Sequence, residues 1–179
     1  TAALLARQLP VIAERLRATL DKLQRPQAED RRSAPAAQWW EGLKQRHAGD
    51  RVNWEAGPLG ATTVPVALFD SVAENLLHNA LGKRQREEGI EIRAILAVDR
   101  DSPTLTVHDS GSAIPAALAG TLFRAPAASA SGLGIGLYHA ARQAEATGYR
   151  LTLEENTPGA VAFHLAPASS APGAEAPAG

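Results

Sequence analysis

The chain has 179 residues, with 18 lysines and arginines against 19 aspartates and glutamates and a formal charge of −1. This balance argues against a nucleic acid as the main partner, because proteins that bind nucleic acids usually carry a basic face. Neither cysteine nor methionine occurs. The lack of cysteine excludes disulfides and cysteine zinc sites and favours a reducing cytoplasm. Because the chain lacks an initiating methionine, we expect it to be a segment of a longer protein.

Residues 3–24 are predicted to form one long amphipathic helix. Its seam recurs in alternating steps of three and four residues, at Leu5, Leu9, Ile12, Leu16, Thr19 and Leu23. Such spacing is that of a heptad repeat. An ordinary surface helix and a dimer-forming helix both fit the pattern. The charged, proline-bearing stretch 25–37 has no periodicity and is predicted to be a linker.

A short helix and two short strands are predicted next. The helix begins near residue 38 and carries Trp39, Trp40 and Leu43 at helical spacing. We expect the tryptophans to anchor packing rather than to bind a ligand. Residues 51–57 and 61–67 are predicted as strands on either side of a Gly-Pro turn.

A second long helix, over residues 66–88, carries the first candidate site. Its predicted buried side consists of Val66, Phe69, Val72, Leu76, Leu77 and Ala80. Asn75 and Asn79 are four residues apart, so on a helix they point the same way from successive turns. Asparagine is a poor helix former, and two readings of the pair stay open. It is either a hydrogen-bonded packing pair or a pair of oxygen ligands for a hard cation such as Mg²⁺.

Two antiparallel hairpins and a helix are predicted in the C-terminal half. Residues 90–98 alternate between apolar and polar and are joined to residues 104–111 by the turn "DRDSP". Residues 149–156 and 160–165 flank the turn "TPG" in the same way. The helix is predicted over roughly 136–147.

Two further groups of residues could contact a ligand. Asp109 follows a strand rich in β-branched residues and precedes Gly111; it is either a turn-forming residue or an acceptor for an exocyclic amine, with the glycine giving room for a flat ring. Gly132, Gly134 and Gly136 come just before the predicted helix. Their amides could face an anion at the helix N-terminus.

The order of these motifs resembles that of the GHKL ATPases, and most closely the catalytic and ATP-binding domain of bacterial sensor histidine kinases. "NLLHNAL" is similar to the N box of that family, "DSGSAIP" to the G1 box, "LFRAP" with Phe123 to the F box, and "GLGIGL" to the G2 box. "PGAVAFHL" resembles the closing strand, and the likeness runs from about Trp39 to Pro167. It implies an α+β two-layer sandwich of the Bergerat type, in which a mostly antiparallel mixed sheet packs on helices.

The resemblance also implies a site for ATP and Mg²⁺. By analogy, Asn79 holds Mg²⁺ against the triphosphate with help from Asn75, Asp109 accepts the adenine amino group, and Gly111 lets the base approach. Lys83 and Asn79 are the implied catalytic residues. The implied nucleotide-binding residues are Asn75, Asn79, Lys83, Asp109, Gly111, Ala113, Ile114, Gly132, Leu133, Gly134, Ile135, Gly136 and Leu137. The loop 114–131 corresponds to the ATP lid.

Three positions depart from the family pattern. The lysine that usually comes three residues after the metal-binding asparagine is replaced by Gly82, so Lys83 or Arg86 is the candidate phosphate contact, with Lys83 preferred. The aromatic residue that often follows this lysine has no counterpart. The second glycine of the G1 box is Ala113, whose methyl group fits only where the backbone is not left-handed.

The implied function is the ATP-binding catalytic portion of a sensor histidine kinase, which phosphorylates a histidine for relay to a response regulator. The implied domains are a partial dimerisation helix (1–24), a linker (25–37), the catalytic domain (38–167) and a disordered tail (168–179). The implied partners are ATP, the phosphoacceptor helix that would precede Thr1, a receiver domain and a second subunit of the parent, but no nucleic acid. No apolar run reaches the roughly 18 residues of a membrane span, so we expect a cytoplasmic domain, whether or not the parent is an inner-membrane sensor.

Two other functions stay open. One is a catalytically weak or non-catalytic GHKL module that binds nucleotide or dimerises. The other is a gyrase-like or mismatch-repair-like ATPase, which usually places a glutamate base four residues before the metal-binding asparagine. That position is Asn75 here, with Glu74 beside it.

Overall fold

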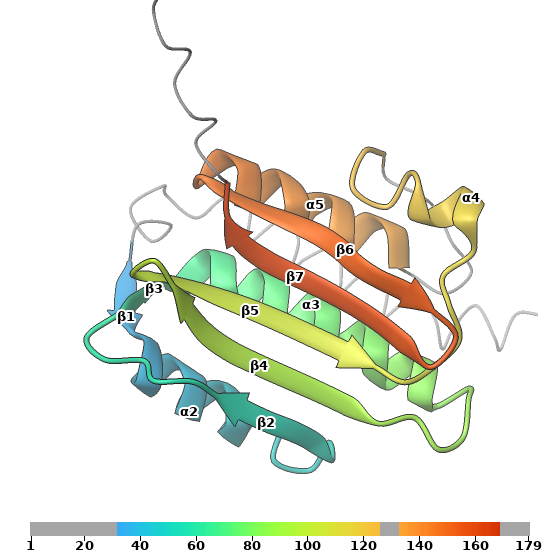
Figure 1. Cartoon of the computed structure of the whole chain (residues 1–179), viewed down its shortest axis with the longest axis horizontal. Helices are drawn as coiled ribbons and strands as arrows, with labels where there is room; N and C mark the ends of the chain where they lie inside the picture. The colour runs from blue at the N-terminus through green and yellow to red at the C-terminus, as the bar shows by residue number, and fades with distance from the viewer. Residues whose placement is uncertain (1–31, 126–132, 169–179) are drawn as a thin grey trace, which may run out of the picture.

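A computed structural model of the chain describes residues 32–125 and 133–168 (Figure 1). The helix predicted over 3–24, the lid residues 126–131, Gly132 and all but the first residue of the predicted tail lie outside the described residues.

A five-stranded sheet is the centre of the fold. Its strands follow the order β2-β4-β5-β7-β6. They are β2 (Val52–Ala56), β4 (Ile92–Asp99), β5 (Ser102–Asp109), β6 (Tyr149–Thr157) and β7 (Ala160–Pro167). Of these neighbours, β2 and β4 pair in parallel and the others pair antiparallel. The predicted mostly antiparallel mixed sheet is confirmed.

Helices cover one face of this sheet, which makes a two-layer sandwich (Figure 1). The two long helices there are α3 (Val66–Arg84) and α5 (Leu133–Ala146). The shorter α2 (Ala36–Arg46) lies near β2, and α4 (Ala116–Ala119) is a single turn in the loop after β5. Two short strands, β1 (Ser33–Pro35) and β3 (Thr63–Pro65), form a separate antiparallel pair.

Local turn chemistry explains the two predicted hairpins, both of which are present. Arg100 and Asp101 join β4 to β5 and both have positive φ, 47° and 66°. This pattern fits the tight two-residue turn that matches strand twist. Gly159, with φ of 89°, supplies the corresponding conformation between β6 and β7 without a steric cost.

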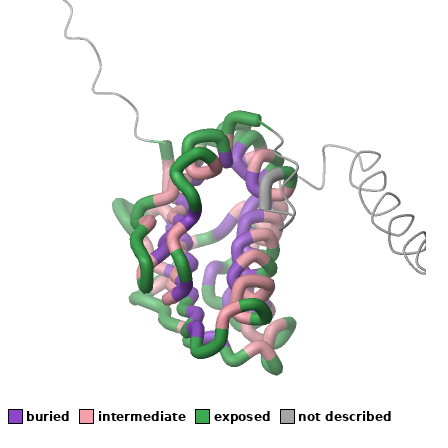
Figure 2. Tube along the Cα trace, turned by 90° about the vertical axis from the view of Figure 1, so that its right-hand side faces the viewer, coloured by how far each residue is buried: buried purple, intermediate pink, exposed green. Residues whose placement is uncertain are grey.

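The core fills the space between the sheet and the helices. Figure 2 shows buried segments of both layers facing each other across this space. The predicted buried side of α3 is confirmed except for Val66, which is half-buried; Leu68 and Ala73 are buried in addition. Trp39 packs edge-on against Phe69 with ring centroids 5.3 Å apart, so the prediction that the tryptophans anchor packing is confirmed.

Three predicted boundaries were wrong. The linker predicted over 25–37 overlaps β1 and the start of α2, because β1 finds a partner in β3 that proline-rich composition does not reveal. α3 ends at Arg84 rather than at residue 88; the chain then turns, and Glu87 accepts hydrogen bonds from Ser112 in the loop after β5. α5 begins at Leu133 rather than near residue 136, so part of the glycine run lies inside the helix.

Candidate functional site

The candidate site residues meet where the second half of α3 passes the end of β5. α3 carries Asn75, Asn79 and Lys83 on successive turns. β5 ends at Asp109, and the loop that follows begins with Ser110. The three α3 residues therefore lie on one side of that helix, and the last of them, Lys83, reaches Asp109.

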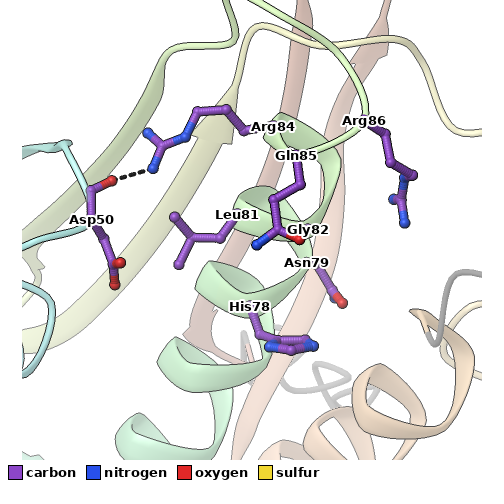
Figure 3. Close-up of a pocket in the computed structure, with 8 residues that line it drawn as sticks. All are labelled: Asp50, His78, Asn79, Leu81, Gly82, Arg84, Gln85 and Arg86. Atoms are coloured by element: carbon purple, nitrogen blue, oxygen red, sulfur yellow. Dashed lines mark hydrogen bonds between the residues drawn. The ribbon is translucent and has the colours of Figure 1, made fainter.

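An open, polar cavity of about 490 Å³ surrounds the C-terminal end of α3. It is lined by Asp50, His78, Asn79, Leu81, Gly82, Arg84, Gln85 and Arg86. Figure 3 shows Asn79 and Arg86 on one side of the helix and Asp50 and Arg84 on the other. Arg84 is fixed there because its guanidinium donates to the backbone carbonyls of Asp50 and Arg51. Asn79 and Arg86 thus share the side on which an anion and a cation could be held.

Asn75 is engaged between two helices instead of lining this cavity. Its side-chain Nδ2 donates to the carbonyl of Ser71 at 2.7 Å. Its amide also lies against Gly136 in the first turn of α5: a β-carbon added at Gly136 would be 3.1 Å from Asn75 Cγ and closer still to Oδ1. This arrangement fits the packing interpretation of Asn75 and does not offer its oxygen to the cavity.

Asp109 is buried and already has two donors. Its Oδ1 accepts the backbone N–H of Gly111 at 3.0 Å and the ammonium of Lys83 at 2.7 Å. The side chains of Lys83 and Asp109 are 13% and 7% exposed. Lys83 also donates to the carbonyl of Ser112 at 2.8 Å. The lysine predicted to contact phosphate therefore lies at the predicted base-binding aspartate.

The space above Gly111 is filled by side chains from α3 and the segment after it. A β-carbon at Gly111 would lie 2.5 Å from Lys83 Cδ and 2.6 Å from Ile90 Cδ1. Gly111 thus permits a close approach, as predicted, but here the approaching atoms belong to the chain itself.

Side-chain hydrogen bonds hold the loop that begins at Ser110 from two sides. Glu87 accepts the backbone N–H of Ser112 at 2.8 Å and its hydroxyl at 2.6 Å, and these hydrogen bonds lower the pKa of the Glu87 carboxyl. On the other side, Asn156 of β6 accepts the N–H of Ile114 at 2.7 Å and donates to its carbonyl at 2.9 Å. The loop is therefore held in a fixed position relative to α3 and the last hairpin.

Ala113 takes the place of a family glycine without strain. Among the described residues, positive φ in a non-glycine residue occurs at Arg51, Arg100 and Asp101 and not at Ala113. The methyl group of Ala113 was expected to fit only where the backbone is not left-handed, and the backbone at Ala113 meets this condition.

The described residues of the glycine run have different surroundings. Leu137 is fully buried in the core, whereas Ile135 is 53% exposed. Leu133 and Gly134 belong to the first turn of α5. Gly136 itself lies against the amide of Asn75.

Glu74 faces away from the candidate site. Its carboxylate contacts Arg46 Nε at 3.1 Å and His47 Nε2 at 3.1 Å, both from the end of α2. This position disfavours Glu74 as the base of a gyrase-like hydrolysis.

Sequence reasoning missed three contributors to the site, Glu87, Ile90 and Asn156. Glu87 was predicted to be a helical residue, and Asn156 reads as an ordinary residue before a turn. No spacing signal marks either one, because their partners are backbone groups distant in the sequence. Ile90 was predicted only as the start of a strand.

The residues fit a nucleotide with Mg²⁺ in part. Within residues 32–125 and 133–168 there is no cluster of three or more acidic or histidine side chains that could hold a metal ion. Mg²⁺ usually takes one or two protein ligands together with phosphate oxygens and water, so Asn79 at the open cavity fits such a site. A purine at Asp109 and Gly111 would have to displace Lys83 and Ile90.

Comparisons with known proteins show the family and the fold. Residues 65–170 match the family described as histidine kinase-, DNA gyrase B-, and HSP90-like ATPase. The fold is similar to the nucleotide-free catalytic domain of histidine kinase ThkA, with a TM-score of 0.61, 18% identity, and coverage of 76% of this chain and 94% of that domain. It is also similar to full-length ShkA in complex with AMPPNP (TM-score 0.60, 18% identity), covering 76% of this chain and 31% of ShkA. No curated protein sequence matches the chain. In the part of the chain that the structure describes, no helix has the length and apolarity to cross a bilayer.

Proposed function

The chain belongs to the histidine kinase-, DNA gyrase B-, and HSP90-like ATPase family, and from this premise we propose that it is the catalytic part of a sensor histidine kinase. It binds ATP with Mg²⁺ and transfers the γ-phosphoryl group to a histidine on a phosphoacceptor helix, for relay to a response regulator. In that transfer the P–O bond to ADP breaks, a P–N bond to the imidazole forms, and the imidazole gives up its proton. The second helix of the acceptor hairpin would be residues 1–24, and the parent would act as a homodimer.

The observation that supports the proposal is that Asn79 and Lys83 lie on successive turns of α3 and that Lys83 contacts Asp109. Asn79 lines an open cavity with Arg86, and Lys83, one turn later, contacts Asp109. Metal-bound phosphates at the first position and a purine at the second would span a single nucleotide. Phosphoryl transfer depends mainly on positioning and charge neutralisation, which is what an amide ligand and a nearby cation provide.

The roles within the site follow from these positions. Asn79 would supply the protein oxygen to Mg²⁺, and Arg86 or a displaced Lys83 would neutralise phosphate charge. Asp109 would accept the amino group of adenine, and Gly111 would admit the ring. Asn75, held against Gly136, would position α5 relative to α3 instead of binding the metal. We expect the Gly132–Gly136 segment to approach the phosphates from the other side.

The test is binding and phosphotransfer by an Asn79→Ala variant. Wild-type protein should bind ADP in calorimetry only when Mg²⁺ is present and should phosphorylate a separately supplied acceptor helix pair. Asn79→Ala should weaken binding of Mg-ADP at least tenfold and abolish phosphohistidine formation. Asn53→Ala is the matched control, since Asn53 lies in β2, outside α3. Full phosphotransfer by Asn79→Ala would refute the metal assignment.

A non-catalytic GHKL module is the second candidate, and the closed contact between Lys83 and Asp109 favours it. Such a module would bind Mg-ADP without yielding phosphohistidine when the acceptor is supplied. Binding together with zero turnover would select this second function over the first.

A further inference from the structure

Lys83 occupies the place where a purine would have to bind. Its ammonium contacts Asp109 Oδ1 at 2.7 Å, and its methylene chain covers Gly111, where an added β-carbon would lie 2.5 Å from Cδ. A purine that reaches the aspartate and rests on the glycine must therefore displace Lys83 at both points, and Ile90 at the glycine.

The contacts of Lys83 make this displacement costly. The lysine donates a second hydrogen bond to the carbonyl of Ser112 at 2.8 Å, and Glu87 holds Ser112 in place. Both partners of the Lys83–Asp109 contact carry a charge and are largely buried. A neutral amino group makes a weaker hydrogen bond to a carboxylate than an ammonium does. Adenine alone is a poor competitor for this carboxylate.

We propose that Lys83 sets the affinity and the base preference of the nucleotide site by competing with the purine for Asp109. The inference rests on the proposed function, since it concerns the purine end of that same site. In the free protein Lys83 holds Asp109, and the amino group of adenine reaches the aspartate only as the lysine swings away from it.

Base preference follows from the chemistry of the pair. A bare carboxylate accepts from the 6-amino group of adenine and repels the 6-carbonyl group of hypoxanthine. An ammonium beside the carboxylate can donate to that carbonyl group. The wild-type site, which offers both charges, should therefore discriminate weakly between adenosine and inosine.

The decisive experiment measures adenosine and inosine binding to wild-type and Lys83→Met proteins by calorimetry. These nucleosides have no phosphate, so any contact of Lys83 with phosphate does not enter the result. Lys83→Met should bind adenosine about tenfold more tightly, because the purine then meets a buried carboxylate that lacks its strongest donor. Preference for adenosine over inosine should rise by a similar factor. Lys44→Met is the matched control, since Lys44 pairs with Glu41 on α2 and should leave both affinities unchanged.

Two further measurements cover the case in which Lys83→Met folds poorly. Lys83→Arg keeps the charge and pairs with carboxylates through a rigid fork, so it should bind adenosine no more tightly than wild type. In the wild-type protein, adenosine should increase the rate at which Lys83 is acetylated by a mild acylating reagent, because the amine is released from Asp109. Lys44 is the internal reference for that rate.

The outcomes separate this inference from the proposed function. If wild type binds Mg-ADP but Lys83→Met gains nothing for adenosine, or if adenosine protects Lys83 from acetylation, competition by Lys83 is overturned and the proposed function stands. If no form of the protein binds adenosine or Mg-ADP, the proposed function fails and this inference fails with it.

Discussion

Replacing Gly136 with alanine should destabilise the domain even though alanine is the better helix former. Gly136 lies in the first turn of α5, where an added β-carbon would be 3.1 Å from Asn75 Cγ and closer still to its Oδ1. Asn75 cannot simply rotate, because its Nδ2 donates to Ser71 and α3 packs closely on α5. The two helices must separate or the amide must leave its hydrogen bond.

The expected magnitude comes from two opposing contributions. Exchange of glycine for alanine in a helix gains about 0.5–1 kcal/mol from backbone entropy. Overpacking costs about 1–3 kcal/mol, and loss of the Asn75 hydrogen bond adds about 1 kcal/mol. We expect Gly136→Ala to lower the free energy of unfolding by about 1–3.5 kcal/mol and the melting temperature by about 3–10 °C.

Urea denaturation with a matched glycine tests this reasoning. Gly82 also lies in a helix, α3, but an added β-carbon there has no atom within 4 Å, so Gly82→Ala should stabilise by up to about 1 kcal/mol. Truncation of the amide in Asn75→Ala/Gly136→Ala should recover much of the loss, giving a coupling energy of about 1–2 kcal/mol. A Gly136→Ala protein as stable as wild type would show that a β-carbon at this position does not clash with Asn75.

The remaining predictions concern the loop after β5. Asn156→Ala should destabilise the domain by about 1–3 kcal/mol, because it leaves the backbone N–H and carbonyl of Ile114 without their partner. Thermal denaturation should show the loss, and the amide of Ile114 should exchange faster with solvent. Unchanged exchange at Ile114 would contradict the role of Asn156 in holding the loop. Glu87→Gln should lower stability at neutral pH. Its carboxyl pKa is lowered from 4.5 by hydrogen bonds to Ser112, so the stabilisation is present above pH 4.5 and is lost as pH falls through the folded-state pKa. Denaturation curves of wild type and variant should converge below that pKa, and a gap that persists there would contradict this assignment.

Periodicity predicted those parts of the fold whose partners are close in sequence. Both hairpins and the buried side of α3 were predicted, because alternation and helical spacing reflect burial on one face. The boundary errors have a different origin. β1 (Ser33–Pro35) is three residues long and takes its pairing from β3, and the first turn of α5 contains Gly136, which lies against Asn75 of α3. Neither contact is visible in the local sequence.

The site was predicted at the level of motifs but not of side-chain direction. Asp109 was expected at a buried strand end, where it lies. Asn75 was expected to face the same ligand as Asn79, yet it packs on Gly136. Lys83 was assigned to phosphate, yet in this structure it contacts Asp109. The long, flexible side chain of a lysine can contact either a phosphate or a carboxylate. Which of the two it contacts depends on burial that only the folded chain defines.

The parallel pairing of β2 with β4 bears on how the domain assembles. Each hairpin joins strands that are adjacent in the sequence and can form early. In contrast, β2 pairs with β4, and β3 and α3 separate these two strands in the sequence. Loop-closure entropy delays contacts of this kind. The two hairpins should thus form before β2 joins the sheet beside β4.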